Sequence, residues 1–267
     1  MFLKNYFLKE KIKQNSYFIW NSQKKNIQTV KQFKPLELKL IIGVDNQKKI
    51  LLKNTINFAE GNFTNNALLW GARGNGKSSL IKSVFNKILI SYKNLKLIQL
   101  NKNNIFDIEY IYSILGKFNH FRFIIFIDDL SFEKIDSDYK IIKSTLDGSI
   151  QNQPTNILLY VSSNRRHLMP RDMIDNERSS AIHTDESVEE KISLSDRFGL
   201  WIGFHKLSQI DYLKIIESYC QHYNITYDEE IHKQAIQWSL QRGNRTGRTA
   251  WQFILNLSSD KNLKIKI

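Results

Sequence analysis

The 267-residue chain has one cysteine, three prolines and no long apolar run, and these scarcities exclude several classes of protein. The single cysteine, Cys220, cannot build an internal disulfide framework, which fits a reducing cytoplasm. No stretch approaches the roughly 18 apolar residues of a membrane span. Lysines interrupt every apolar run of the N-terminal segment MFLKNYFLKEKIKQ, so it lacks the hydrophobic core of a signal peptide. We therefore expect a soluble, cytoplasmic protein.

Negative charge is also scarce, because 26 acidic residues face 39 lysines and arginines and leave a net charge of +13. Much of this excess lies early in the chain. Residues 1–66 hold 12 lysines and four acids, which gives this segment a net charge of +8. Two explanations stay open: the segment binds nucleic acid or another anionic partner, or the abundance of Lys, Asn and Ile reflects an AT-biased coding sequence.

Short apolar runs alternate with helical patterns through the middle of the chain. The runs lie at 67–70, 95–100, 121–128, 156–163 and 200–204, and the helical patterns lie at 77–91, 104–117 and 138–149. This alternation predicts an α/β fold with a parallel sheet covered by helices on both faces. Beyond residue 206, three helical patterns follow without a strand. We divide the chain into a basic N-terminal extension (1–38), an αβα core (39–205) and a helical subdomain (206–267).

Three of only 11 glycines fall within six positions, in the segment GARGNGKS at 71–78. The segment fits the pattern G-x-x-x-x-G-K-[S/T], and it stands between an apolar strand and a helical pattern. Backbone N–H groups of such a loop bind the phosphates of a nucleotide, so side chains must be absent where the chain approaches them. We expect Lys77 to contact the β- and γ-phosphates and the Ser78 hydroxyl to bind Mg²⁺. The predicted binding residues are Gly71, Ala72, Arg73, Gly74, Asn75, Gly76, Lys77, Ser78 and Ser79.

Two acids end the apolar run FIIFIDDL, which is predicted to be a strand beside this loop. An acid at such a strand end holds the Mg²⁺ shell in phosphate-loop enzymes, so Asp128 is the predicted metal-linked residue. Asp129 is the predicted general base for the attacking water, with Glu133 as an alternative. The guanine-specific pattern N/T-K-x-D does not occur on a later strand, since NKNN at 101–104 lacks the acid.

Polar residues at two further strand ends and at the last helix complete a pattern that resembles the AAA+ ATPases, over about residues 38–258. The resemblance implies that Asn164 positions the attacking water. It also implies that Arg197 reaches the γ-phosphate of a neighbouring subunit, and that Arg248, or alternatively Arg245, contacts the bound nucleotide. The class usually has Asp followed by Glu at the strand end, whereas this chain has Asp129 in the second place.

The same resemblance implies an overall architecture and an activity. It implies a five-stranded parallel sheet in the order 5-1-4-3-2 and a helical lid, with ATP and Mg²⁺ as ligands and a ring or partial ring of subunits. The turn LIIGVDNQ is similar to the segment that lines the adenine, which suggests Ile41, Ile42 and Gly43. The strings WGARGNGKSSL, DDLSFE, SNRRHL and LSDRFGLW are similar to a bacterial family of uncharacterised AAA+ ATP-binding proteins.

Two functions remain open. The first is an enzyme that couples ATP hydrolysis to remodelling or loading of a macromolecule. The second is a slowly hydrolysing switch or scaffold that docks on nucleic acid or protein through its basic N-terminus. The acidic stretch at 172–190 is either an element that contacts a partner or a disordered insertion.

Overall fold

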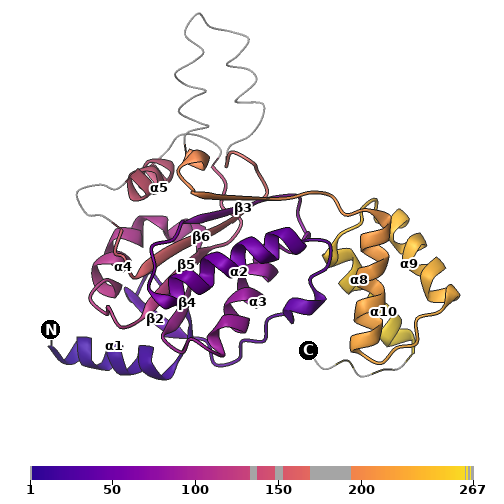
Figure 1. Ribbon diagram of the computed structural model, residues 1–267, viewed down its shortest axis with the longest axis horizontal. Helices are drawn as coiled ribbons and strands as arrows, with labels where there is room; N and C mark the ends of the chain where they lie inside the picture. The colour runs from indigo at the N-terminus through magenta and orange to yellow at the C-terminus, as the bar shows by residue number, and fades with distance from the viewer. Residues whose placement is uncertain are drawn as a thin grey trace, which may run out of the picture.

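The computed structural model of the chain describes residues 2–132, 137–147, 153–168, 194–261, 263 and 265. Within these residues, one sheet contains β1 (Tyr17–Asn21), β2 (Asn26–Thr29), β3 (Ala67–Gly71), β4 (Leu95–Leu100), β5 (Arg122–Ile127), β6 (Ile157–Ser163) and β7 (Leu200–Phe204). The strands lie in the order β2-β1-β4-β5-β6-β3-β7. The expected α/β class is confirmed, and the sheet carries a helical subdomain beside it (Figure 1).

The expectation of a five-stranded, wholly parallel sheet is wrong, because the sheet is mixed and has seven strands. β1 pairs in parallel with β4, and the four-residue β2 pairs antiparallel with β1. The full order therefore differs from the expected one at this edge, while the other five strands run β7-β3-β6-β5-β4 in parallel. The basic segment 1–38 thus contributes two strands to the sheet.

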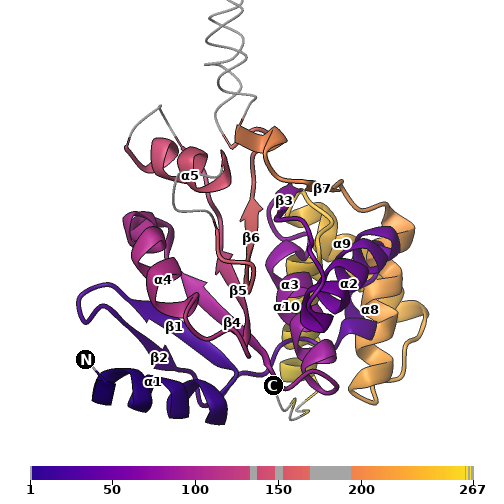
Figure 2. The same cartoon turned by 60° about the vertical axis from the view of Figure 1, so that its left-hand side comes forward.

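Helices cover both faces of this sheet (Figure 2). On one face lie α2 (Asp45–Glu60) and α3 (Lys77–Leu89), and on the other lie α1 (Phe2–Gln14), α4 (Ile108–Leu115) and α5 (Ser137–Asp147). Five consecutive residues of β5 are buried because both of its faces are covered. Double burial explains why the central strands are continuous apolar runs in the sequence.

The helical subdomain, or lid, consists of α8 (Gln209–His222), α9 (Glu229–Gln241) and α10 (Gly247–Asp260). Ser208, Asp228 and Thr246 cap these helices, since each side chain accepts a hydrogen bond from the backbone N–H three residues on. The three helices enclose an apolar core of their own, to which Leu40 of the short helix η1 (Leu38–Leu40) contributes. Within the described part of the chain, neither these helices nor those of the core are long and apolar enough to cross a membrane.

Candidate functional site

The glycine-rich segment forms the loop between β3 and α3, at the carboxyl edge of the sheet. Gly74 and Gly76 have φ angles of +81° and +88°, in the left-handed region that side chains disfavour. A Cβ on Gly74 would lie 2.9 Å from Thr246 Oγ1, at the start of the lid helix α10. The backbone N–H of Arg248 donates to Gly74 O at 3.2 Å. A bare backbone here lets the loop and the lid approach each other closely.

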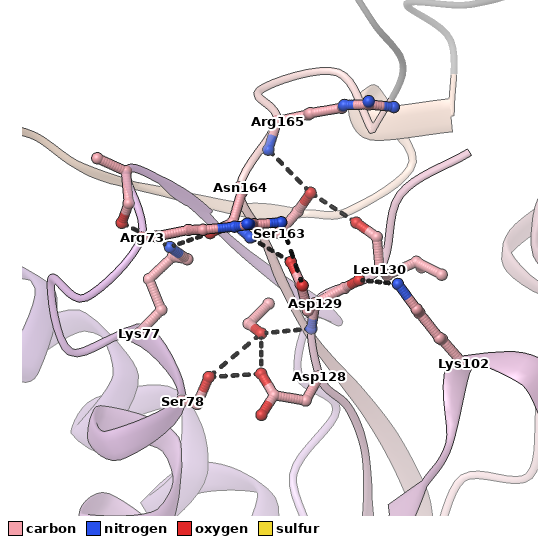
Figure 3. A network of polar contacts seen from close by, with 12 residues as sticks. Arg73, Lys77, Ser78, Lys102, Asp128, Asp129, Leu130, Ser163, Asn164 and Arg165 are labelled. Carbon is pink, nitrogen blue, oxygen red and sulfur yellow. Dashed lines mark hydrogen bonds and ion pairs between the residues drawn. The ribbon is translucent and has the colours of Figure 1, made fainter. Parts of the chain in front are cut away.

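The Lys77 side chain is turned into this loop and is only 6% exposed. Its Nζ donates to Gly71 O at 2.7 Å, to Ala72 O at 2.8 Å and to Asn164 Oδ1 at 3.0 Å (Figure 3). Burial is the main effect on this group and lowers the pKa of Lys77 to about 8, although the carboxylates of Asp128 and Asp129 favour its charged form. The ammonium group is therefore held at the phosphate loop by oxygen acceptors.

A single carboxylate oxygen joins the loop to two neighbouring strands. Asp128 follows β5, and its Oδ1 accepts hydrogen bonds from Ser78 Oγ and from Ser162 Oγ, both at 2.5 Å. Ser162 also accepts a 3.0 Å hydrogen bond from the backbone N–H of Asp129. The sequence analysis missed Ser162, whose only signal is a polar residue near the end of the apolar run NILLYVSS.

Asp129 is held in an unusual backbone conformation beside these groups. Its φ angle is +54°, and its Oδ1 accepts a hydrogen bond from Asn164 Nδ2. Arg73 Nη2 lies 3.9 Å from the other carboxylate oxygen, in a solvent-exposed ion pair. Asp tolerates the left-handed region better than a longer side chain does. The backbone conformation therefore accounts for Asp at this position. Glu133, the alternative general base, lies outside the described residues.

A cavity of about 900 Å³ extends from the phosphate loop to the lid. At its inner end it is lined by Arg73, Gly74, Asn75, Gly76, Lys77, Ser78, Ser79, Asp128, Asp129 and Asn164. The volume is within the usual range for a bound small molecule, about 300–1,000 Å³. The predicted phosphate and metal residues thus surround one space, with Gly71 and Ala72 behind it as acceptors for Lys77.

The outer end of the cavity is mostly apolar and aromatic, and Lys34, Glu37 and His222 also line the cavity. Ile41 and Ile42 line it, whereas Gly43 is not among the lining residues, and a Cβ at Gly43 would lie 3.0 Å from the side chain of Leu207. On the lid side, the sequence analysis missed three aromatic residues: Tyr219, Tyr223 and Trp251. The Trp251 ring centroid lies 5.5 Å from that of Tyr219 and 5.8 Å from that of Tyr223. This end offers flat apolar surfaces of the kind that stack on a planar base.

The three candidate arginines lie in different places. Arg248 lines the cavity, at the start of α10. Arg245 does not line it, and its Nη2 donates to Gln209 Oε1 at 3.1 Å. Arg197 lies in the turn before β7 and is also absent from the residues that line this cavity. The acidic stretch 172–190 lies outside the described residues.

Comparison with solved structures identifies the fold. The Holliday junction branch migration motor RuvB of Thermotoga maritima is 18% identical, with a TM-score of 0.56 over 86% of this chain and 67% of RuvB. Domain III of the T. maritima replication initiation protein DnaA is 14% identical, with a TM-score of 0.53 over 87% of this chain and 94% of that one. The Orc1 protein of Aeropyrum pernix in complex with DNA is 15% identical, with a TM-score of 0.56 over 84% of this chain and 62% of Orc1.

These likenesses show that the chain shares its fold with RuvB, domain III of DnaA and Orc1. No curated protein matches the chain. Residues 13–261 match the family model described as "Protein of unknown function (DUF815)", and the chain therefore belongs to this family.

Proposed function

We propose that the protein is a Mg²⁺-dependent ATPase. The observation that carries this proposal is the pair of 2.5 Å hydrogen bonds to Asp128 Oδ1, which bring the phosphate-loop hydroxyl of Ser78 to the carboxylate at the end of β5. Hydroxyl and carboxylate oxygens are the ligands that Mg²⁺ prefers, so Ser78 and Asp128 fit that ion. When bound, Mg²⁺ would neutralise charge on the nucleotide phosphates.

The other residues around the cavity have separate proposed roles in binding the phosphates, activating the water and binding adenine. The backbone N–H groups of the loop and the Lys77 ammonium would bind the phosphates. Asp129 would accept the proton of the attacking water, and Asn164, which contacts both Lys77 and Asp129, would fix the water relative to the γ-phosphate. The apolar end formed by Ile41, Ile42 and the lid aromatic residues would bind adenine.

Substitution of Lys77 tests nucleotide binding directly. Lys77→Ala should abolish measurable ATP binding in calorimetry, because the phosphates lose their only buried cation among the described lining residues. Lys87→Ala is a matched control, since it removes an exposed lysine from the same helix. Normal ATP binding by Lys77→Ala would remove the basis of the proposed function.

We further propose that Arg197 acts on the nucleotide of a neighbouring subunit, so that the protein works as a homo-oligomer, in a ring or partial ring. Arg248 would act on the chain's own nucleotide, whose cavity it lines. An arginine finger is worth about 10³ to 10⁵ in rate. ATPase activity per subunit should therefore rise steeply with protein concentration.

A mixing experiment tests whether Arg197 acts on the neighbouring subunit. Arg197→Ala and Lys77→Ala should each be inactive alone, and mixing them should restore part of the activity, because a Lys77→Ala subunit still supplies Arg197 to an intact phosphate loop. Activity that stays flat on dilution, together with no recovery on mixing, would exclude the role in trans.

The macromolecular partner that we favour is nucleic acid. The supporting observations are the net charge of +8 in residues 1–66 and the similarity to RuvB, described as a branch migration motor, and to Orc1, solved with DNA. Replacing the exposed Lys9, Lys13, Lys24 and Lys31 by Gln should weaken DNA or RNA binding. The salt slope should fall by about 0.7 to 0.9 for each phosphate that the variant no longer neutralises. An unchanged slope would favour the codon-bias explanation.

The alternative function is a slowly hydrolysing switch or scaffold. The observation in its favour is Asp129, whose side chain is one methylene shorter than the Glu usual in the class and is tied to Asn164. Single-turnover hydrolysis decides between the two. A rate that nucleic acid stimulates supports the motor, whereas a slow and unstimulated rate supports the switch.

A further inference from the structure

A second cavity of about 910 Å³ lies next to the phosphate loop, on the side of the α9–α10 connection. Three segments that are distant in the sequence line it: residues 72–75, residues 206–207, and residues 239–246 with 248, 249 and 252. Its cationic lining residues are Arg73, Lys206, Arg242, Arg245 and Arg248, and no acidic side chain occurs among the described residues that line it. The proposed function makes no use of Lys206, Arg242 or Arg245.

In the described part of the chain, the only ion pair made by a cation of this cavity is that of Arg73 with Asp129, at 3.9 Å. Among the described residues, no ion pair involves Lys206, Arg242 or Arg245. Arg242 lies over the Trp238 ring, 4.1 Å from its centroid. Arg245 donates from Nη2 to the neutral Gln209, and its buried Nε has no hydrogen-bond partner. Like charges gathered without counter-charges repel one another, and an anion between them relieves this repulsion.

A solvated set of surface charges is the simpler interpretation, and the shape of the region argues against it. The cations line a concavity whose volume is within the range of small-molecule sites, about 300–1,000 Å³. Guanidinium groups present planar pairs of donors that match phosphate oxygens. A nucleic-acid strand would need an extended groove, whereas the residues that line this space form one concavity beside the phosphate loop.

We propose that this cavity is a second anion site, which binds a small phosphorylated molecule carrying several negative charges. The site is separate from the nucleotide cavity but shares Arg73, Gly74, Asn75 and Arg248 with it. Two anionic ligands that draw on the same two arginines weaken each other's binding, and this coupling is reciprocal. The second ligand therefore acts as a negative regulator of nucleotide binding.

Inorganic tripolyphosphate serves as the probe, with the phosphate loop filled by a non-hydrolysable ATP analogue and Mg²⁺. We expect calorimetry to show one further saturable binding event in the full-length protein. Lys206→Gln with Arg242→Gln should weaken this event at least tenfold and leave the affinity for the analogue unchanged. Lys214→Gln with Lys233→Gln removes two exposed lid lysines outside both cavities and should change neither. Lys206→Arg with Arg242→Lys keeps the charges and should retain tripolyphosphate binding.

Three results would overturn the second site. They are the absence of a further binding event in the wild-type protein, an equal loss in the lid-lysine control, and binding of an oligonucleotide, but not tripolyphosphate, that depends on Lys206 and Arg242. If the proposed ATPase function is wrong, the ATP analogue itself will not bind. This result is distinct from all three.

Discussion

Ser78 Oγ lies 2.5 Å from Asp128 Oδ1, although 50 positions separate these residues in the sequence. The first lies near the start of α3 and the second follows β5, so the fold alone brings them together. The same carboxylate oxygen also accepts from Ser162 at 2.5 Å. This shared oxygen is the point at which the phosphate loop, β5 and β6 meet.

The first prediction concerns this pair. Mg²⁺ should raise the nucleotide affinity of the wild-type protein by a certain factor. In Ser78→Ala and in Asp128→Asn this factor should be at least about tenfold smaller, because each variant lacks a proposed oxygen ligand. The measurement is nucleotide affinity with and without Mg²⁺. Ser113→Ala, at an exposed position of α4, is the control. Full Mg²⁺ dependence in both variants would contradict the proposed metal site.

The second prediction concerns pH. Burial lowers the pKa of Lys77 to about 8, and bound phosphates would hold the side chain in its charged form. Above pH 8, binding must therefore be accompanied by proton uptake, and affinity falls as the pH rises. The dissociation constant for ATP should increase about tenfold from pH 7 to pH 9. Lys77→Arg should bind without this dependence, because arginine keeps its charge, and a similar slope in that variant would rule out Lys77 as its origin.

The third prediction separates the two candidate bases. Asp129→Asn keeps a residue that tolerates a φ of +54° and removes the carboxylate. We expect kcat to fall about 10² to 10⁴-fold with ATP affinity largely kept. Glu133→Gln is the companion variant. If Glu133→Gln loses activity and Asp129→Asn does not, the assignment of Asp129 is wrong.

Asp129→Glu tests the backbone argument for the same position. The longer side chain should reach further toward the nucleotide, but the left-handed conformation, which Asn and Asp adopt more readily, costs most other non-glycine residues about 1–2 kcal/mol. We therefore expect a lower free energy of unfolding than in the wild-type protein. Thermal and denaturant unfolding measure this difference, and an unchanged stability would show that the conformation is not strained for Glu.

The fourth prediction concerns the attachment of the N-terminal segment. Lys96 of β4 is 2% exposed, and its Nζ donates to Asn15 O, beyond the end of α1, at 2.9 Å. Burial lowers its pKa from 10.5 to about 8. Between these two values, the unfolded chain holds a proton that the folded chain lacks, so the contribution of Lys96 to stability rises with pH.

Lys96→Met removes this titration. From pH 8 to pH 10.5, the free energy of unfolding of the wild-type protein should rise relative to that of Lys96→Met by up to about 3 kcal/mol. Lys93→Met, at an exposed position before β4, should follow the wild-type profile. Parallel profiles for Lys96→Met and the wild-type protein would show that Lys96 does not titrate in this range.

The sequence predicted the phosphate loop and the acid that follows β5 because both depend on local pattern. A loop of bare backbone needs glycines at fixed spacing, and buried parallel strands need continuous apolar runs. The placement of Ser78 beside Asp128 also depends on the strand order, which only the resemblance implied, because β6 lies between β3 and β5.

Other features left no local signal. β1 and β2 are short, lie at the edge and alternate buried with exposed residues, so lysine-rich surroundings obscured them. Tyr219 and Trp251 each lie on a helix of the lid. The spacing of apolar residues along a helix is the same whether they line a cavity or fill a core. Lys206, Arg73 and Arg242 line the second cavity together only because the lid lies against the loop. These features depend on tertiary packing, which residue periodicity does not encode.

The parallel pairing of β1 with β4 has a consequence for how the chain is made. During synthesis, β1 leaves the ribosome before its partner β4, which follows only after α2, β3 and α3. Until then the hairpin of β1 and β2 has no neighbour on its inner side, and an isolated hairpin is marginally stable in water. The hairpin thus gains its neighbour within the sheet only after α2, β3 and α3 have been translated.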